Sequence, residues 1–214
     1  MAQNVFYDIW TTSDLTQAAF TTTHATELIT SAAHGLSNDD CVQFKNSGGA
    51  LPTGFSATTN YFVISATTNT FQVAATKGSS TAVTISDNGT GTHTWLKQGA
   101  GKHIFVADFQ DVMVTFDTDG GADAAMTVKF VGSISEEAPD FNKAQSTTNQ
   151  WDYVEIVDTE DGSAIDGDTG IAVSTADDHR QFAINTDNLR WVGAIISSRT
   201  EGECRISLNA TSFN

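Results

Sequence analysis

Acidic residues crowd one part of the second half of the chain, and their chemistry is that of a calcium site. Positions 158–170 contain Asp158, Glu160, Asp161, Asp166 and Asp168. Calcium takes about six to eight oxygen ligands from closely spaced carboxylates, carbonyls and waters. Asp-Gly pairs are also typical of hairpin turns, where they stay solvated. Both interpretations are open, and the solvated turn is favoured, because the spacing does not match a complete calcium-binding loop.

Other constellations that could support chemistry fail on their spacing. The loop at 117–123 is also acidic, but it lacks the full ligand pattern of a calcium-binding loop. His34 and His93 flank one region and could approach each other, yet no pair of histidines has a zinc-binding spacing. Cys41 and Cys204 lack C-x-x-C neighbours, and no nucleophile elbow or phosphate-binding loop is present. We therefore predict no catalytic residue and no cofactor.

The charge of the chain excludes several classes of partner. Ten Lys and Arg stand against 26 Asp and Glu in 214 residues, a formal net charge of −16. Nucleic acids and anionic membranes both require clustered positive charge, so neither is an expected partner. No segment approaches the roughly 20 apolar residues needed to span a bilayer, and the first residues do not resemble a secretion signal. We expect a soluble protein made in the cytoplasm.

The pattern of apolar residues predicts an all-β protein. Short runs alternate apolar with polar residues, as in 112–116 and 126–130, and Gly, Asn or Ser clusters separate them. No long run has the spacing of an amphipathic helix. A series of such strands is typical of sandwiches and barrels. We expect a small β-barrel module together with a β-sandwich domain that is jelly-roll-like.

A shift in composition suggests where the domains begin and end. Positions 27–96 are rich in Thr, Ser and Gly, whereas most acidic residues follow position 98. We predict an N-terminal arm at 1–26, a barrel at 27–96, a linker at 97–102 and a sandwich at 103–214. The arm contains Val5, Phe6, Ile9 and Trp10, which predict a strand that adds to the sheet of another subunit. This would make the protein an oligomer.

The first domain resembles a known module through an ordered series of short motifs. These are His34-Gly-Leu-Ser-Asn-Asp-Asp40, Leu51-Pro-Thr-Gly-Phe55, Asn60-Tyr-Phe-Val-Ile64, Asn69-Thr-Phe-Gln-Val-Ala74 and Gly89-Thr-Gly-Thr-His-Thr-Trp95. Over 28–96 the chain is similar to a small β module common in structural proteins of tailed bacteriophages, often named after the first catalytic-cysteine half-domain of ubiquitin-activating enzymes. The resemblance implies a compact barrel on a particle surface. It implies no thioester chemistry.

The second half is similar to small proteins of phage virion gene clusters. The similarity is in Lys129-Phe-Val-Gly-Ser-Ile-Ser-Glu136, Asn149-Gln-Trp-Asp-Tyr-Val154, Ile165-Asp-Gly-Asp-Thr-Gly170, Arg180-Gln-Phe182 and Leu189-Arg-Trp-Val192. It implies a non-enzymatic virion protein, assembled in the bacterial host cytoplasm, whose partners are the major capsid protein or tail proteins. A capsid decoration protein is the favoured role. A tail, collar or fibre component and a host-surface glycan-binding module remain alternatives, the latter through exposed tryptophans.

Overall fold

The computed structural model describes residues 3–109, 111–119, 125–173 and 178–212. Strands dominate, and two short 3-10 turns, η1 (Thr12–Asp14) and η2 (His24–Thr26), also occur. The all-β prediction is therefore confirmed. The chain forms two compact units: unit 1 comprises Met1–Leu15 and Ala100–Asn214, and unit 2 comprises Thr16–Gly99. No helix in the described residues is long and apolar enough to cross a membrane.

Unit 2 is a closed antiparallel barrel. Its strands are β2 (Gln17–Thr23), β3 (Leu28–Thr30), β4 (Cys41–Ser47), β5 (Tyr61–Ile64), β6 (Thr70–Ala74) and β7 (Thr92–Ala100), the last residue of β7 belonging to unit 1. Neighbours follow the order β7-β2-β3-β6-β5-β4, and β4 pairs back with β7 to close the ring. Phe44, Phe71 and Trp95 fill the interior. The indole of Trp95 donates a hydrogen bond to Ser31 Oγ at 3.0 Å, which satisfies its buried N–H.

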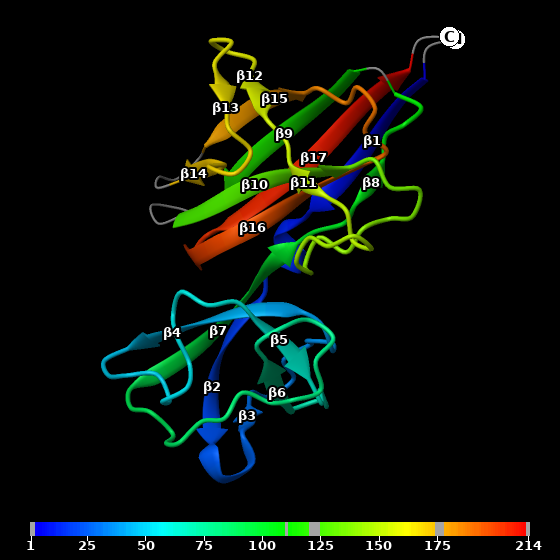
Figure 1. Ribbon diagram of the computed structural model, residues 1–214. Coiled ribbons are helices and arrows are strands. Elements are labelled where there is room, and N and C mark those ends of the chain that lie inside the picture. Colours follow the sequence, from blue (N-terminus) through cyan, green and yellow to red (C-terminus); the bar gives the residue numbers. More distant parts are fainter. Residues whose placement is uncertain (1–2, 110, 120–124, 174–177, 213–214) are drawn as a thin grey trace. The chain divides into compact units, whose positions relative to one another are not determined.

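Unit 1 is a sandwich of two antiparallel sheets, visible as two layers in Figure 1. One sheet has the order β1-β17-β9-β15-β12-β13, with β1 (Gln3–Trp10), β9 (Asp111–Asp119), β12 (Ile156–Asp158), β13 (Ala164–Ile165), β15 (His179–Ile184) and β17 (Glu203–Ser212). The other is built on β10 (Ala125–Ser133) and β16 (Trp191–Glu201), to which β8 (Ile104–Phe105), β11 (Asp152–Tyr153) and β14 (Ile171–Val173) add.

The core of unit 1 follows from the period of two that the strands share. Phe116 on β9 and Leu208 on β17 are fully buried, as are Val128 on β10 and Ile196 on β16. Alternate residues of each strand point to opposite faces, so each sheet contributes one apolar face to the space between them. The outer face carries polar residues such as Thr115 and Gln181, whereas Thr118 of β9 is polar but buried on the inner face.

The structure corrects the predicted N-terminal arm. Residues 3–10 form β1, which pairs along its length with β17 of the same chain, and Ile9 and Trp10 are 1% and 3% exposed. Both residues belong to the core of unit 1. Pairing with β17 satisfies the backbone along one edge of β1, and it places these two side chains against the apolar interior. Residues 3–26 therefore do not form an independent arm.

The predicted boundaries at 27, 97 and 102 also change. The barrel includes β2 and begins at Thr16, because β2 lies between β7 and β3. The predicted linker at 97–102 is mostly strand, since β7 continues to Ala100. The amides of Gly101 and Lys102 then donate to the carbonyls of Ala194 and Ile9 at 3.0 Å each. The sandwich predicted at 103–214 is thus completed by β1 from the other end of the chain.

Candidate functional site

Three of the five carboxylates of the acidic loops, those of Asp158, Asp161 and Asp166, cap their own turns. Asp158 Oδ1 accepts the amide of Glu160 at 2.9 Å, and Asp161 Oδ1 accepts the amide of Ser163 at 2.8 Å. Hydrogen bonds from the side chain and the backbone of Ser163 lower the pKa of Asp161, which is exposed. The geometry is that of solvated turns, in which short polar side chains bond to backbone two residues ahead.

Of the second pair of predicted ligands, only Asp166 caps its own turn. Asp166 Oδ1 accepts the amides of Asp168 and Thr169, and Asp168 forms an ion pair with Lys129 at 3.2 Å. Within the described part of the chain, no three His, Cys, Asp or Glu side chains gather as metal ligands would. Positions 120–123 of the other acidic loop lie outside the described residues.

The two histidines of the barrel have structural partners. His34 Nδ1 accepts the amide of Leu36 at 3.0 Å, and its ring packs edge-on against Phe71. His93 Nδ1 contacts the Asn46 amide nitrogen at 2.8 Å. Both rings are buried, so they fit the packing and turn roles expected from the sequence more closely than an open metal site.

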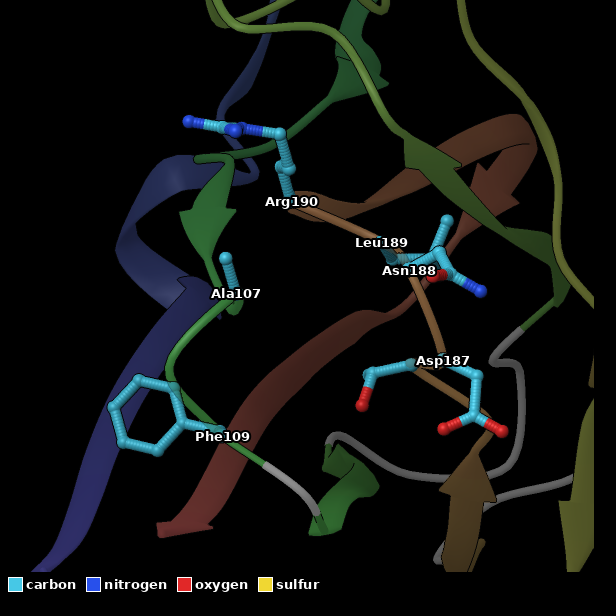
Figure 2. A pocket seen from close by; sticks show the side chains of 7 residues that line it. Ala107, Phe109, Asp187, Asn188, Leu189 and Arg190 are labelled. Carbon is cyan, nitrogen blue, oxygen red and sulfur yellow. The ribbon is translucent and has the colours of Figure 1, made fainter.

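A polar hollow of about 500 Å³ lies where the chain crosses between the two sheets of unit 1. Figure 2 shows Phe109 on one side and Asp187 and Asn188 on the other, with the Arg190 guanidinium turned away from Asp187. The guanidinium instead lies 5.8 Å from the centre of the Phe105 ring. Asp187 and Asn188 lie in the connection between β15 and β16.

A second hollow, of about 440 Å³, is apolar. It is lined by Gly132, Ser133, Ile134, Gln150, Trp151, Asp152, Val154 and Leu189. Ile134 is 64% exposed at this hollow. A Cβ on Gly132 would lie 2.9 Å from Val154, so a larger residue there would disturb the hollow. Trp151 packs edge-on against Phe141 and Tyr153, and its indole donates to the Lys143 carbonyl at 3.0 Å.

The outer face of the six-stranded sheet carries an uncharged row that sequence reasoning missed. Cross-strand pairing aligns Phe6 with Asn209, Asn209 with Met113, Met113 with Ala183, and Ala183 with Val157. We call these five residues the outer row. Phe6 is 57% exposed, and the other four are half-buried. Paired residues in neighbouring strands share a face, so the row crosses five strands at a right angle to them.

The charge nearest Phe6 on this face is compensated. Asp8 Oδ1 accepts hydrogen bonds from Arg205 at 3.0 Å and from the Ser207 hydroxyl at 2.9 Å. Partial burial raises the pKa of Asp8, but the bonds from Ser207 and Arg205 outweigh it, and the net shift is downward. The Arg205 guanidinium also lies 5.8 Å from the centre of the Phe6 ring. An acidic unit therefore presents an uncharged row beside a paired charge.

Comparison with known proteins gives two distant structural likenesses. No protein-family model and no curated protein matches the chain. The SPBc2 prophage-derived protein YomS is 14% identical, with a TM-score of 0.34, over 54% of this chain and 82% of that one. The PBSX exported protein XepA is 11% identical, with a TM-score of 0.38, over 99% of this chain and 82% of that one. At these TM-scores neither likeness supports a functional argument.

Proposed function

We propose that the chain is a non-enzymatic structural protein of a tailed-phage particle, and within that class a capsid decoration protein. One observation carries the proposal: the closed barrel Thr16–Gly99 is inserted into the sandwich between β1 and β8. Each unit has its own core. A complete scaffold that carries a complete module suits display on a surface. The inserted segment is also the one that resembles the phage surface module.

The distribution of charge supports an attached scaffold and a displayed module. Unit 2 has three Lys against four Asp or Glu, which leaves seven Lys or Arg and 22 Asp or Glu in unit 1. Unit 1 therefore carries a net charge of −15 and unit 2 only −1. An acidic scaffold repels copies of itself and other acidic surfaces at long range. Attachment then depends on apolar contact and strand pairing, for which unit 1 has the outer row and the edge of β1.

Labelling of intact particles tests this proposal. Antibodies raised against the full chain are applied to particles purified from an infected lysate, and bound gold is located by electron microscopy. We expect label distributed over the heads. Particles from a phage lacking the gene are the control and should remain unlabelled. Label confined to tails, collars or fibres would refute the decoration role and support a tail, collar or fibre component. Unlabelled particles would refute any role in the virion.

A second candidate function is glycan binding, favoured by the apolar hollow. Sugar rings stack on exposed aromatic faces, and Trp151 lines the hollow together with the polar Gln150 and Asp152. Of the other tryptophans, Trp10 and Trp95 are buried in the cores. A glycan array on the full chain tests the idea, with Gln150→Ala as the variant and Gln181→Ala as a matched control, because Gln181 is exposed on β15 and lies outside the hollow. Glycan binding that Q150A weakens and Q181A preserves would support it, and an array without signal would refute it.

A further inference from the structure

The edge of β1 is the open end of the six-stranded sheet. β1 is the terminal strand, visible beside β17 in Figure 1. On its outer side, the carbonyl of Ile9 accepts the amide of Lys102 at 3.0 Å. Between Asn4 and Asp8, the described backbone forms its strand pairing with β17 alone. Every second residue of an edge strand directs its N–H and C=O away from the sheet, so this stretch offers a template for another strand.

This edge lacks most of the features by which proteins block unwanted pairing. Such features are proline, exposed lysine, inward-pointing charge and bulges. The segment Asn4–Val–Phe–Tyr–Asp8 has neither proline nor lysine, and its one charge is paired with Arg205. The bulge in β1 lies between Asp8 and Trp10, at the end already bonded to Lys102. Phe6, 57% exposed, lies at the middle of the open stretch.

The sequence of the edge is complementary to itself in one register. We propose that β1 pairs antiparallel with β1 of a second copy, with Phe6 opposite Phe6 of that copy. Asn4 then lies opposite Asp8 of the second copy, an amide donor facing a carboxylate, and Val5 lies opposite Tyr7. If the second strand slides by two residues in either direction, Phe6 lies opposite Asn4 or opposite Asp8 of the second copy instead. The central register alone matches aromatic with aromatic, a favourable cross-strand pair.

The outer row continues through this interface. Because the row runs across the strands and ends at Phe6, a two-fold axis at Phe6 joins the rows of two copies end to end. The contact is isologous, the commonest arrangement in soluble dimers. The contact also lies where the acidic unit 1 has the uncharged outer row and where the carboxylate of Asp8 is paired with Arg205. This inference goes beyond the proposed function, because it concerns self-association wherever the protein is attached.

Charge placed at the two-fold axis tests the pairing. The mass of the full chain is measured by light scattering after size-exclusion chromatography for wild type, Phe6→Asp and Phe6→Lys. We expect a wild-type dimer, and a dissociation constant raised roughly tenfold or more in each variant, because like charges then lie directly opposite. A mixture of F6D and F6K should dimerise again, since one carboxylate then faces one ammonium.

A matched control separates this effect from a general loss of exposed apolar surface. Ile134→Asp makes the same chemical change at a similarly exposed residue, 64% against 57%, directly after β10 of the other sheet. Its dimerisation should equal that of wild type. Thermal melts should show that F6D and I134D remain folded. A monomeric wild type, a fully dimeric F6D, or a mixture that stays monomeric would overturn the proposal.

Cysteine cross-linking tests the register. In the proposed pairing, a Phe6→Cys thiol faces its own copy at the Cα separation that a disulfide needs, about 4.5–5.5 Å. Asn4→Cys is the control, because two residues at position 4 would be four positions apart along the paired strands, beyond disulfide reach. The natural Cys41 and Cys204 are buried and should not contribute. Efficient cross-linking of N4C, or none of F6C, would refute this register.

Discussion

At the scale of the residue, the two cysteines are components of the cores. Both are free and buried, Cys41 in the barrel and Cys204 in the sandwich. Burial raises the pKa of each thiol to about 12, well above its ordinary value near 9. The thiolate is the reactive form of cysteine, so burial disfavours the reactive form of both side chains at neutral pH.

These thiols predict a loss of stability at high pH. Because the folded state holds the proton to a pKa of about 12 and the unfolded state only to about 9, the unfolded state ionises first. Stability is therefore complete below pH 9 and falls between pH 9 and 12, by up to about 1.4 kcal/mol per pH unit for each thiol. Denaturant melts of wild type and of a Cys41→Ala, Cys204→Ala variant should diverge above pH 9. Equal slopes would show that the thiols do not cause the loss.

At the scale of the element, the end of β1 at Trp10 is buried in the core, whereas its middle at Phe6 is exposed. Trp10 is buried and donates its indole N–H to the Ala194 carbonyl at 3.2 Å. Phe6, on the same strand, is mostly exposed. A strand of this kind stabilises its own sandwich through one face and end while its other face stays open to solvent.

The two aromatic residues of β1 should therefore differ sharply on truncation. We expect Trp10→Ala to lower the free energy of unfolding of unit 1 by about 3–5 kcal/mol, through the lost burial and the cavity left behind. Phe6→Ala should cost under about 1 kcal/mol in the monomer, because little surface leaves water there. Denaturant melts below the dimer dissociation constant measure both. Equal small effects would restore the predicted N-terminal arm at 1–26.

The barrel makes a second prediction at this scale, about its minimal length. A fragment covering Thr16–Gly99 contains all six strands, so we expect a cooperative melt from it alone. A fragment covering 28–96 lacks β2, which bridges β7 and β3, and the ring cannot close. It should remain unfolded by circular dichroism. Folding of the shorter fragment would show that the ring is not the cooperative unit.

At the scale of the whole molecule, charge opposes the association that the β1 edge favours. Nearly all of the net charge of −16 belongs to unit 1, the unit that pairs. Salt screens such repulsion beyond about 10 Å at 0.1 M, whereas strand pairing and apolar contact persist. Self-association should therefore strengthen as salt rises.

Sedimentation of the full chain at low and high sodium chloride tests this expectation. The dissociation constant should fall roughly tenfold or more between about 0.05 and 0.5 M salt, as the Debye length shortens. Sucrose at matched viscosity is the control, and it should leave the dissociation constant unchanged. A dimer that dissociates as salt rises would indicate that attractive ion pairs hold the interface.

Local pattern alone determined the class of fold. The period-two alternation in residues such as Val112, Val114 and Phe116 arises from each strand's own geometry, so it can be recognised without knowing the neighbouring strand. The Asp-Gly loops likewise show their turn chemistry in a few adjacent residues, and the capping bonds of Asp158 and Asp161 agree with it.

Tertiary structure decided which strands became neighbours. The partner of β1 is β17, at the opposite end of the chain, and no short-range pattern connects Trp10 with Ile206. The sequence therefore predicted a strand at 5–10 but misplaced its partner in another subunit. The outer row has the same origin, since Phe6, Met113 and Val157 come from three distant segments. Strand pairing depends on the joint burial of all apolar faces, and only the folded sheet brings those faces together.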